Sequence, residues 1–256
     1  MNRTVKRGLL IAVTLIVAWK AMSAVLFPSS SLHYKLSIDV DDNGTIRHGE
    51  GVIGVGFQSQ GPLRIDATPQ WSVDFSGEAI PIDIGAKGTL FVLLTGDPKR
   101  ERPSGDYRTD ERYSPFDAGR DGLVEYFQFY VNDLPNGLGA KSKIDAFANS
   151  RTSVELTPNA LPMLVRFRDV SDPKTVELVD PNHLDASFGP RVKIARAMVE
   201  ITDAPMTVGI EKRLGWLRGG YLEKRLFEPH GGAVDQVPPE RRLTDGDFWR
   251  VAERQL

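Results

Sequence analysis

The fold of this chain is decided by residues 34–57, Tyr-Lys-Leu-Ser-Ile-Asp-Val-Asp-Asp-Asn-Gly-Thr-Ile-Arg-His-Gly-Glu-Gly-Val-Ile-Gly-Val-Gly-Phe. Apolar and polar residues alternate from Tyr34 to Val40, and a similar alternation returns from Val52 to Phe57. Successive side chains of a β-strand point to opposite faces, so each alternation predicts a half-buried strand. Asn43-Gly44 lies between them and is the dipeptide favoured in two-residue hairpin turns. The stretch therefore predicts a long β-hairpin.

Further strands and a few short helices are expected along the rest of the chain. The alternating or β-branched stretches are residues 71–75, 80–84, 90–94, 125–131, 163–167, 175–179 and 192–202, the last with a bulge near Arg196. Capping residues and helical spacing predict short helices over 181–188, 205–217 and 244–255. The expected fold class is mainly β: an antiparallel, sandwich-like domain with a few short helices, preceded by one N-terminal transmembrane helix.

The composition excludes several classes of site. The 256 residues include no Cys, which removes disulfides, zinc-thiolate sites and cysteine nucleophiles. Lys and Arg number 32 against 34 Asp and Glu, so the chain lacks the basic excess typical of nucleic-acid binding. The first 30 residues hold four bases and no acid, which leaves 28 bases and 34 acids, a net charge of −6, for the remainder.

The N-terminal region predicts export. A basic segment, residues 1–7, precedes a nearly continuous apolar stretch over residues 8–27. Twenty helical residues would extend for about 30 Å, which matches the hydrocarbon core of a bilayer, and flanking bases stay on the cytoplasmic side. We expect a single-pass anchor in a bacterial inner membrane, with the lipid bilayer as its partner. The alternative is a signal peptide cleaved after small residues near Ser23 or Ala24, which would leave the protein free in the periplasm.

The region after the anchor divides into a linker, a domain and a tail. Residues 28–31 are the linker, 32–227 the periplasmic β-rich domain and 228–256 a Pro/Gly-rich tail with a short C-terminal helix. Residues 97–122 contain 13 charged residues and predict a loop in this domain. Tyr107, Tyr113 and Phe116 lie in this loop, and aromatic side chains of this kind are candidate contacts to another envelope protein.

Residues 39–50 match the calcium-loop pattern D-x-[DN]-x-[DN]-G-x5-E. The candidate ligands are Asp39, Asp41, Asn43, Thr45 and Glu50. Both flanks alternate with period two, whereas this calcium loop requires a helix on each side. We therefore favour an acidic hairpin turn and keep calcium as the alternative.

Other chemical motifs are incomplete. Gly49-Glu-Gly51-Val-Ile-Gly54 matches a dinucleotide fingerprint, but it continues as a strand where a helix is required, so we expect bends or tight sheet packing and no cofactor. The chain has no G-x-S-x-G elbow. Its four histidines, His33, His48, His183 and His230, are far apart in the sequence.

Three motifs resemble an uncharacterised family of bacterial N-terminally anchored envelope proteins. They are Ser187-Phe-Gly-Pro190, Glu200-Ile-Thr-Asp-Ala-Pro205 and Gly209-Ile-Glu-Lys-Arg-Leu-Gly-Trp-Leu217. The likeness covers most of residues 32–217 in outline, but neither the charged loop nor the tail. The resemblance implies an anchored periplasmic domain and no particular activity.

A non-enzymatic binding or scaffold role at the envelope is the function that we expect. Whether the protein is an enzyme stays open. The first alternative is an envelope hydrolase or transferase, whose site would combine His48 or His183 with carboxylates in a polar pocket. The second is a calcium-stabilised adhesion or sensing domain built on residues 39–50.

Overall fold

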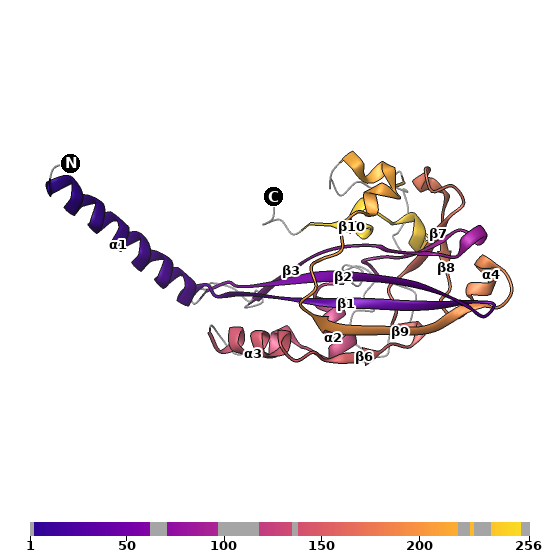
Figure 1. Cartoon of the computed structure of the whole chain (residues 1–256), viewed down its shortest axis with the longest axis horizontal. Coiled ribbons are helices and arrows are strands. Elements are labelled where there is room, and N and C mark those ends of the chain that lie inside the picture. Colours follow the sequence, from indigo (N-terminus) through magenta and orange to yellow (C-terminus); the bar gives the residue numbers. More distant parts are fainter. Residues whose placement is uncertain are drawn as a thin grey trace.

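The structure is a computed structural model of the whole chain. It describes residues 3–61, 71–96, 118–134, 138–219, 226–227 and 237–251, without the side chains of 3–11, 120 and 132. Antiparallel sheets dominate the described residues and the helices of the β domain are short, so the β-rich part of the expected fold is confirmed (Figure 1), whereas the N-terminal helix differs from the expectation.

The large sheet has six strands, in the order β10-β3-β2-β1-β9-β6. Their bounds are Trp249–Arg250, Trp71–Glu78, Thr45–Ser59, Ser29–Asp42, Val192–Thr202 and Ser153–Glu155. The long hairpin is confirmed, with β1 and β2 paired without a break from Ser29↔Gln58 to Asp42↔Thr45. The bulge in β9 is also confirmed, since Asp39 pairs with Arg196 and Val40 with Ile194.

The small sheet has four strands, in the order β4-β5-β7-β8. Their bounds are Ile80–Asp83, Thr89–Val92, Leu164–Phe167 and Val176–Val179. Only Ala79 separates β3 from β4, so the chain passes directly from the edge region of one sheet to the edge of the other.

The first core lies between the two sheets. The even-numbered side chains of β1 from Leu32 to Val40 are at most 3% exposed and pack with Ile82 and Leu90 of the small sheet. Two short helices, α2 (Arg120–Phe127) and α3 (Leu138–Ala148), contribute buried side chains to the same core.

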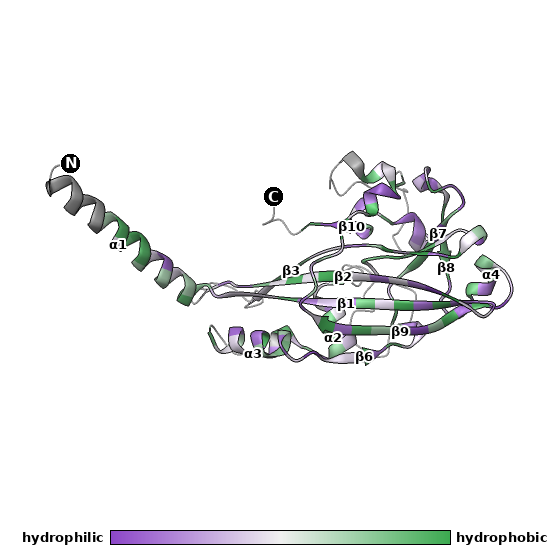
Figure 2. Cartoon of the chain, viewed as in Figure 1, coloured by the Kyte–Doolittle hydropathy of each residue, from purple (hydrophilic) through white to green (hydrophobic). Residues whose placement is uncertain are grey.

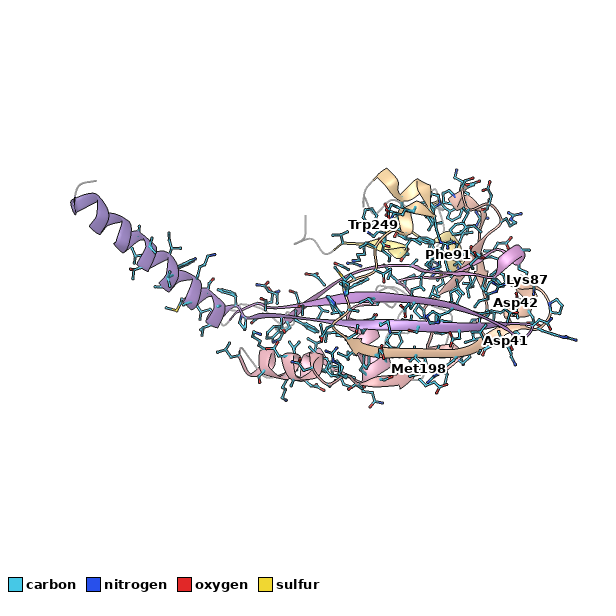
Figure 3. The ribbon with its side chains drawn as sticks, viewed as in Figure 1. Asp41, Asp42, Lys87, Phe91, Met198 and Trp249 are labelled. Atoms are coloured by element: carbon cyan, nitrogen blue, oxygen red, sulfur yellow. The ribbon has the colours of Figure 1, made fainter. Side chains whose placement is uncertain are left out.

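The second core lies on the other face of the small sheet. Phe91, Met163 and Val165 pack there with Leu214 and Phe248. The segments that cover this face are mostly 3-10 turns: η5 (Ile210–Lys212), η6 (Gly215–Gly219), η8 (Pro239–Arg241) and η9 (Asp245–Asp247). Figure 3 places Phe91 and Trp249 on this side of the molecule.

The strand expected over 125–131 is wrong. Helix α2 occupies its first half and ends at Gln128, whose φ is 53°. Leu123 and Tyr126 are three positions apart, which places them on the same side of a helix, and Tyr126 packs edge-on against Tyr34. The aromatic run has a high β propensity, but the helical spacing of its apolar residues suits the core better.

The expected helices are shorter than predicted. Helix α4 spans Leu184–Phe188, the second half of the segment expected over 181–188. The segment 205–217 contains 3-10 turns where we expected one amphipathic helix. Thr244 does form a capping box with Asp247, but the described residues after it form η9 and β10.

The N-terminal helix α1 spans Arg3–Leu26 and extends away from the β domain (Figure 1). The expectation of a transmembrane helix is corrected: among the residues that the structure describes, no helix is both long and apolar enough to cross a bilayer. Lys20 interrupts the mostly apolar side chains that are described for this helix, from residue 12 to 26.

Candidate binding site on the hairpin of β1 and β2

One face of the large sheet points away from the first core, and we call it the open face. The odd-numbered residues of β1 from His33 to Asp41 lie there, because the even-numbered ones are buried. The register adds residues of β2 and β9. From β2 they are Ile46, His48 and Glu50, and from β9 they are Arg196, Met198 and Glu200.

A charge network crosses three strands of the open face. Lys35 Nζ lies 2.9 Å from Glu200 Oε1 and 3.6 Å from Glu50 Oε2. His48 Nδ1 lies 2.7 Å from Asp39 Oδ1, and its Nε2 lies 3.5 Å from Glu50 Oε2. The network places acids and bases in alternation on a solvent-exposed sheet surface.

The network shifts two pKa values upward. The hydrogen bond to Glu200 raises the pKa of Lys35, against the opposing effect of desolvation. The hydrogen bond to Asp39 is the main cause that raises the pKa of His48, with Glu50 adding to it and partial burial opposing it. Both cations are therefore stabilised by carboxylates on neighbouring strands.

The hairpin turn is the one that Asn43-Gly44 predicts. Both residues have positive φ, 52° and 89°, as a type I′ turn requires. Gly44 N donates to Asp41 Oδ1 at 2.6 Å, and Lys87 Nζ lies 2.6 Å from Asp42 Oδ1. Figure 3 shows Asp41, Asp42 and Lys87 close together at the end of the hairpin.

The five candidate calcium ligands do not surround one point. Thr45 closes the turn opposite Asp42, whereas Glu50 lies opposite Ser37, five positions further along β2. Five strand residues span about 17 Å, and calcium–oxygen distances are only about 2.3–2.6 Å. The described residues contain no group of three His, Asp or Glu side chains that could hold a metal ion. In this geometry Asp39 and Glu50 share His48, while Asn43 Oδ1 accepts a hydrogen bond from Arg191.

Glycines let other segments approach β2 closely. A Cβ on Gly49 would lie 2.5 Å from Ile82 Cγ1, and one on Gly51 would lie 2.6 Å from Ile80 Cγ1. A Cβ on Gly54 would lie 2.6 Å from the sulfur of Met206. The expectation of tight packing around a glycine-rich strand is confirmed, and β2 continues as a strand through the whole fingerprint.

Residues 203–209 form a strap from β9 toward η5. His33 Nδ1 lies 2.8 Å from the carbonyl oxygen of Ala204, to which it donates. Val52 N donates to Thr207 Oγ1 at 2.9 Å, and Thr207 N donates to Val52 O at 3.3 Å. The strap thus bonds to the side of β2 that faces away from β1, and no sequence motif indicates this contact.

The same side of β2 carries the backbone groups of Ile46, His48 and Glu50, and we call this part of the strand the outer edge. Val52 directs both its N–H and its C=O to the strap, and strand residues alternate in this direction with period two. The N–H and C=O of Ile46, His48 and Glu50 therefore also point away from β1. All three residues are exposed, and no described segment forms a strand ladder with them on the side that faces away from β1.

The described histidines occupy three different settings. His48 contacts carboxylates on the open face, His33 bonds to a backbone carbonyl, and His183 is exposed just before α4. His230 lies outside the described residues. Of the two histidines considered for a hydrolase or transferase site, His48 therefore contacts carboxylates, those of Asp39 and Glu50.

The candidate partner contacts Tyr107, Tyr113 and Phe116 lie outside the described residues. Of the charged loop 97–122, the structure describes residues 118–122. Ala118 is buried, and its carbonyl oxygen accepts a hydrogen bond of 2.5 Å from the hydroxyl of Tyr34. The end of the loop is therefore bound to the first core.

Lys35, Glu200 and Thr207 are the residues of this site that sequence reasoning did not single out. Lys35 had a weak signal, since it is a polar position of the alternating first strand. Its partner Glu50 lies in the same hairpin, whereas its partner Glu200 lies in β9, far away in the chain, and follows only from the strand order.

No family model matches the chain, and neither do any curated protein or solved structure.

Proposed function

We propose that this protein is a non-enzymatic binding or scaffold protein of the bacterial cell envelope, with its β domain in the periplasm. The open face is the observation that carries the binding role. It combines exposed charges from three strands on one rigid sheet. A charged sheet face of this kind is suited to binding the surface of another protein, whereas small-molecule sites are usually concave and largely apolar.

The apolar surface of α1 supports a position next to lipid. Leu15, Val17 and Trp19 are 65%, 62% and 74% exposed, and the described part of α1 is coloured mostly as hydrophobic in Figure 2. Removing apolar surface from water is favourable by about 25 cal/mol per Å2. We therefore propose that α1 contacts a bilayer through these side chains. Cleavage near Ser23 or Ala24 is the alternative, and it would release the β domain.

Photo-crosslinking in intact cells tests the binding role. A benzophenone amino acid replaces Arg196, which is exposed on the open face, and a matched variant carries it at Val170, exposed in the loop between β7 and β8. We expect a discrete crosslinked product from position 196 that is absent at position 170. Equal or absent crosslinking at both positions would remove the support for a binding surface on the open face.

Fractionation and mass measurement test the location. The full-length mass in the membrane fraction, together with protease sensitivity of the β domain only after the outer membrane is opened, is the expected result. A mass lacking about 24 residues in the soluble periplasmic fraction would establish the cleaved form. Recovery in the cytosol would contradict both.

A further inference from the structure

We propose that the outer edge of β2 binds an extended segment of a partner protein, which adds a strand to the large sheet. The edge consists of the backbone N–H and C=O groups of Ile46, His48 and Glu50. This inference rests on the proposed binding function and names the kind of partner and its mode of attachment. Strand addition of this type uses main-chain hydrogen bonds for affinity and alternate side chains for specificity.

The edge is held rigid by the strand on its other side. β2 pairs with β1 without a break from Thr45 to Gln58, and its core side is packed against Ile80 and Ile82 at Gly49 and Gly51. Little conformational entropy is therefore lost by the sheet when a strand binds. The three residues offer up to six main-chain hydrogen bonds.

Two segments of the chain already use the same side of β2. Strand β3 pairs with residues 54–59, and the strap bonds to both backbone groups of Val52. The outer edge continues this line toward the turn. Residues 46–50 contain no proline, a residue that often protects exposed strand edges from unwanted pairing.

The side chains beside the edge indicate the chemistry of the partner. Ile46 is 56% exposed and Val208, in the strap, is 79% exposed, so both ends of the edge offer apolar contact. The side chain of Glu50 is 54% exposed, and Lys35 and His48 lie 3.6 Å and 3.5 Å from it, so it has room for another cation. The partner strand thus carries a Lys or Arg opposite Glu50 and an apolar residue opposite Ile46, four positions apart on the same face.

A designed peptide tests the pairing directly. The probe is the capped, fluorescently labelled sequence Thr-Lys-Val-Thr-Val-Val-Thr, in which Lys and the second of the adjacent valines are four positions apart. Two control peptides replace Lys by Glu or methylate the backbone nitrogen of the central Thr. We expect the probe to bind the full-length protein in detergent, and both controls to bind at least tenfold more weakly.

Two variants at position 48 separate the contribution of the backbone N–H to peptide affinity from that of the imidazole side chain. His48→Pro removes the outward N–H without breaking the ladder to β1, a position where an edge strand tolerates proline. His48→Ala removes the same imidazole but keeps the N–H. We expect a loss of affinity of tenfold or more for His48→Pro and of less than threefold for His48→Ala.

Equal losses in the two variants, unchanged binding of the N-methylated peptide, or no binding of the probe up to about 1 mM would overturn the inference. If His48→Pro does not fold, the N-methylated peptide decides the question on the natural protein. Crosslinking from position 196 combined with failure of the probe would leave the proposed binding function standing and remove strand addition. Failure of both would remove the two together.

Discussion

The two cores of this protein are built differently. The first core is formed mainly by rows of apolar side chains from regular strands, to which the short helices α2 and α3 add further side chains. The second core is closed by 3-10 turns, and buried carboxylates stabilise these turns. The strands around the first core satisfy their backbone groups in ladders, whereas an irregular layer needs other polar groups inside the protein to satisfy its backbone.

Two carboxylates illustrate this need. Glu78 is 6% exposed and accepts a hydrogen bond of 2.8 Å from Ile210 N, at the start of η5. Asp247 accepts hydrogen bonds from both the N–H and the hydroxyl of Thr244. Burial raises the pKa of both carboxyls, and these hydrogen bonds oppose the shift.

Truncating a central side chain of each core should have the largest effect. Phe248 and Ile38 are both 0% exposed, and we expect Phe248→Ala to lower the free energy of unfolding by about 3–5 kcal/mol and Ile38→Ala by about 2–5 kcal/mol. Hydrogen exchange shows where each loss falls. Phe248→Ala should increase exchange in residues 210–217 more than in β1, because Phe248 packs against Trp216. Equal increases in both segments would mean that the two cores form a single cooperative unit.

Adding a methyl group between the sheets should have the next largest effect. Gly51→Ala places a Cβ against Ile80, and we expect a loss of about 1–3 kcal/mol, measured by denaturant unfolding. In the Ile80→Ala background the same change should cost much less, since the obstructing atoms are gone. A control at Gly56, where a Cβ would meet nothing closer than 3.9 Å, should show no such dependence. Additive losses for Gly51→Ala and Ile80→Ala would contradict close packing of β4 on β2.

The buried carboxylates should make the second core sensitive to pH. Because the folded-state pKa of Glu78 is raised above 4.5, the folded protein binds the proton more tightly, and this contribution to stability is lost as pH rises from about 4.5 through the raised pKa. Glu78→Gln should remove this decline, which is at most about 1.4 kcal/mol per pH unit. Unfolding curves at several pH values measure it, with the exposed Glu155→Gln as control. Parallel pH profiles for Glu78→Gln and the natural protein would argue against a buried, titrating carboxyl.

The open face should show the smallest effect. His48 should titrate above 6.5 in NMR spectra, and Asp39→Asn should bring its pKa back toward that value. The stability that protonated His48 contributes is fully present below pH 6.5, and it is lost as the pH rises through the raised pKa. Because the side chain is half exposed, we expect a contribution below about 1 kcal/mol. An unchanged His48 titration in Asp39→Asn would contradict the charge network.

The candidate site could be predicted only in part. The hairpin, its turn and the tight packing around the glycines follow from local residues, because turn dihedrals and alternation are local properties. The calcium pattern has the right residue order, but strand geometry separates Thr45 from Glu50 by five positions along β2. Lys35 bonds to Glu200 in β9 and Val52 bonds to Thr207 in the strap. Both partners are more than 150 residues away in the chain, and no local pattern encodes these contacts.

The sequence by itself determined most of the strands, the turn at Asn43-Gly44 and the bulge near Arg196, since these depend on side-chain period and on which residues accept positive φ. Only the tertiary structure decided that the aromatic run beginning at Glu125 starts as a helix, because the packing of Tyr126 against Tyr34 in the first core favours helical spacing over β propensity. It also decided that the chain passes from the large sheet to the small sheet between β3 and β4. It decided as well that the outer edge of β2 extends beyond the residues that pair with β3 and the strap. Both features depend on which strands become neighbours, and that choice is made by packing between segments distant in sequence.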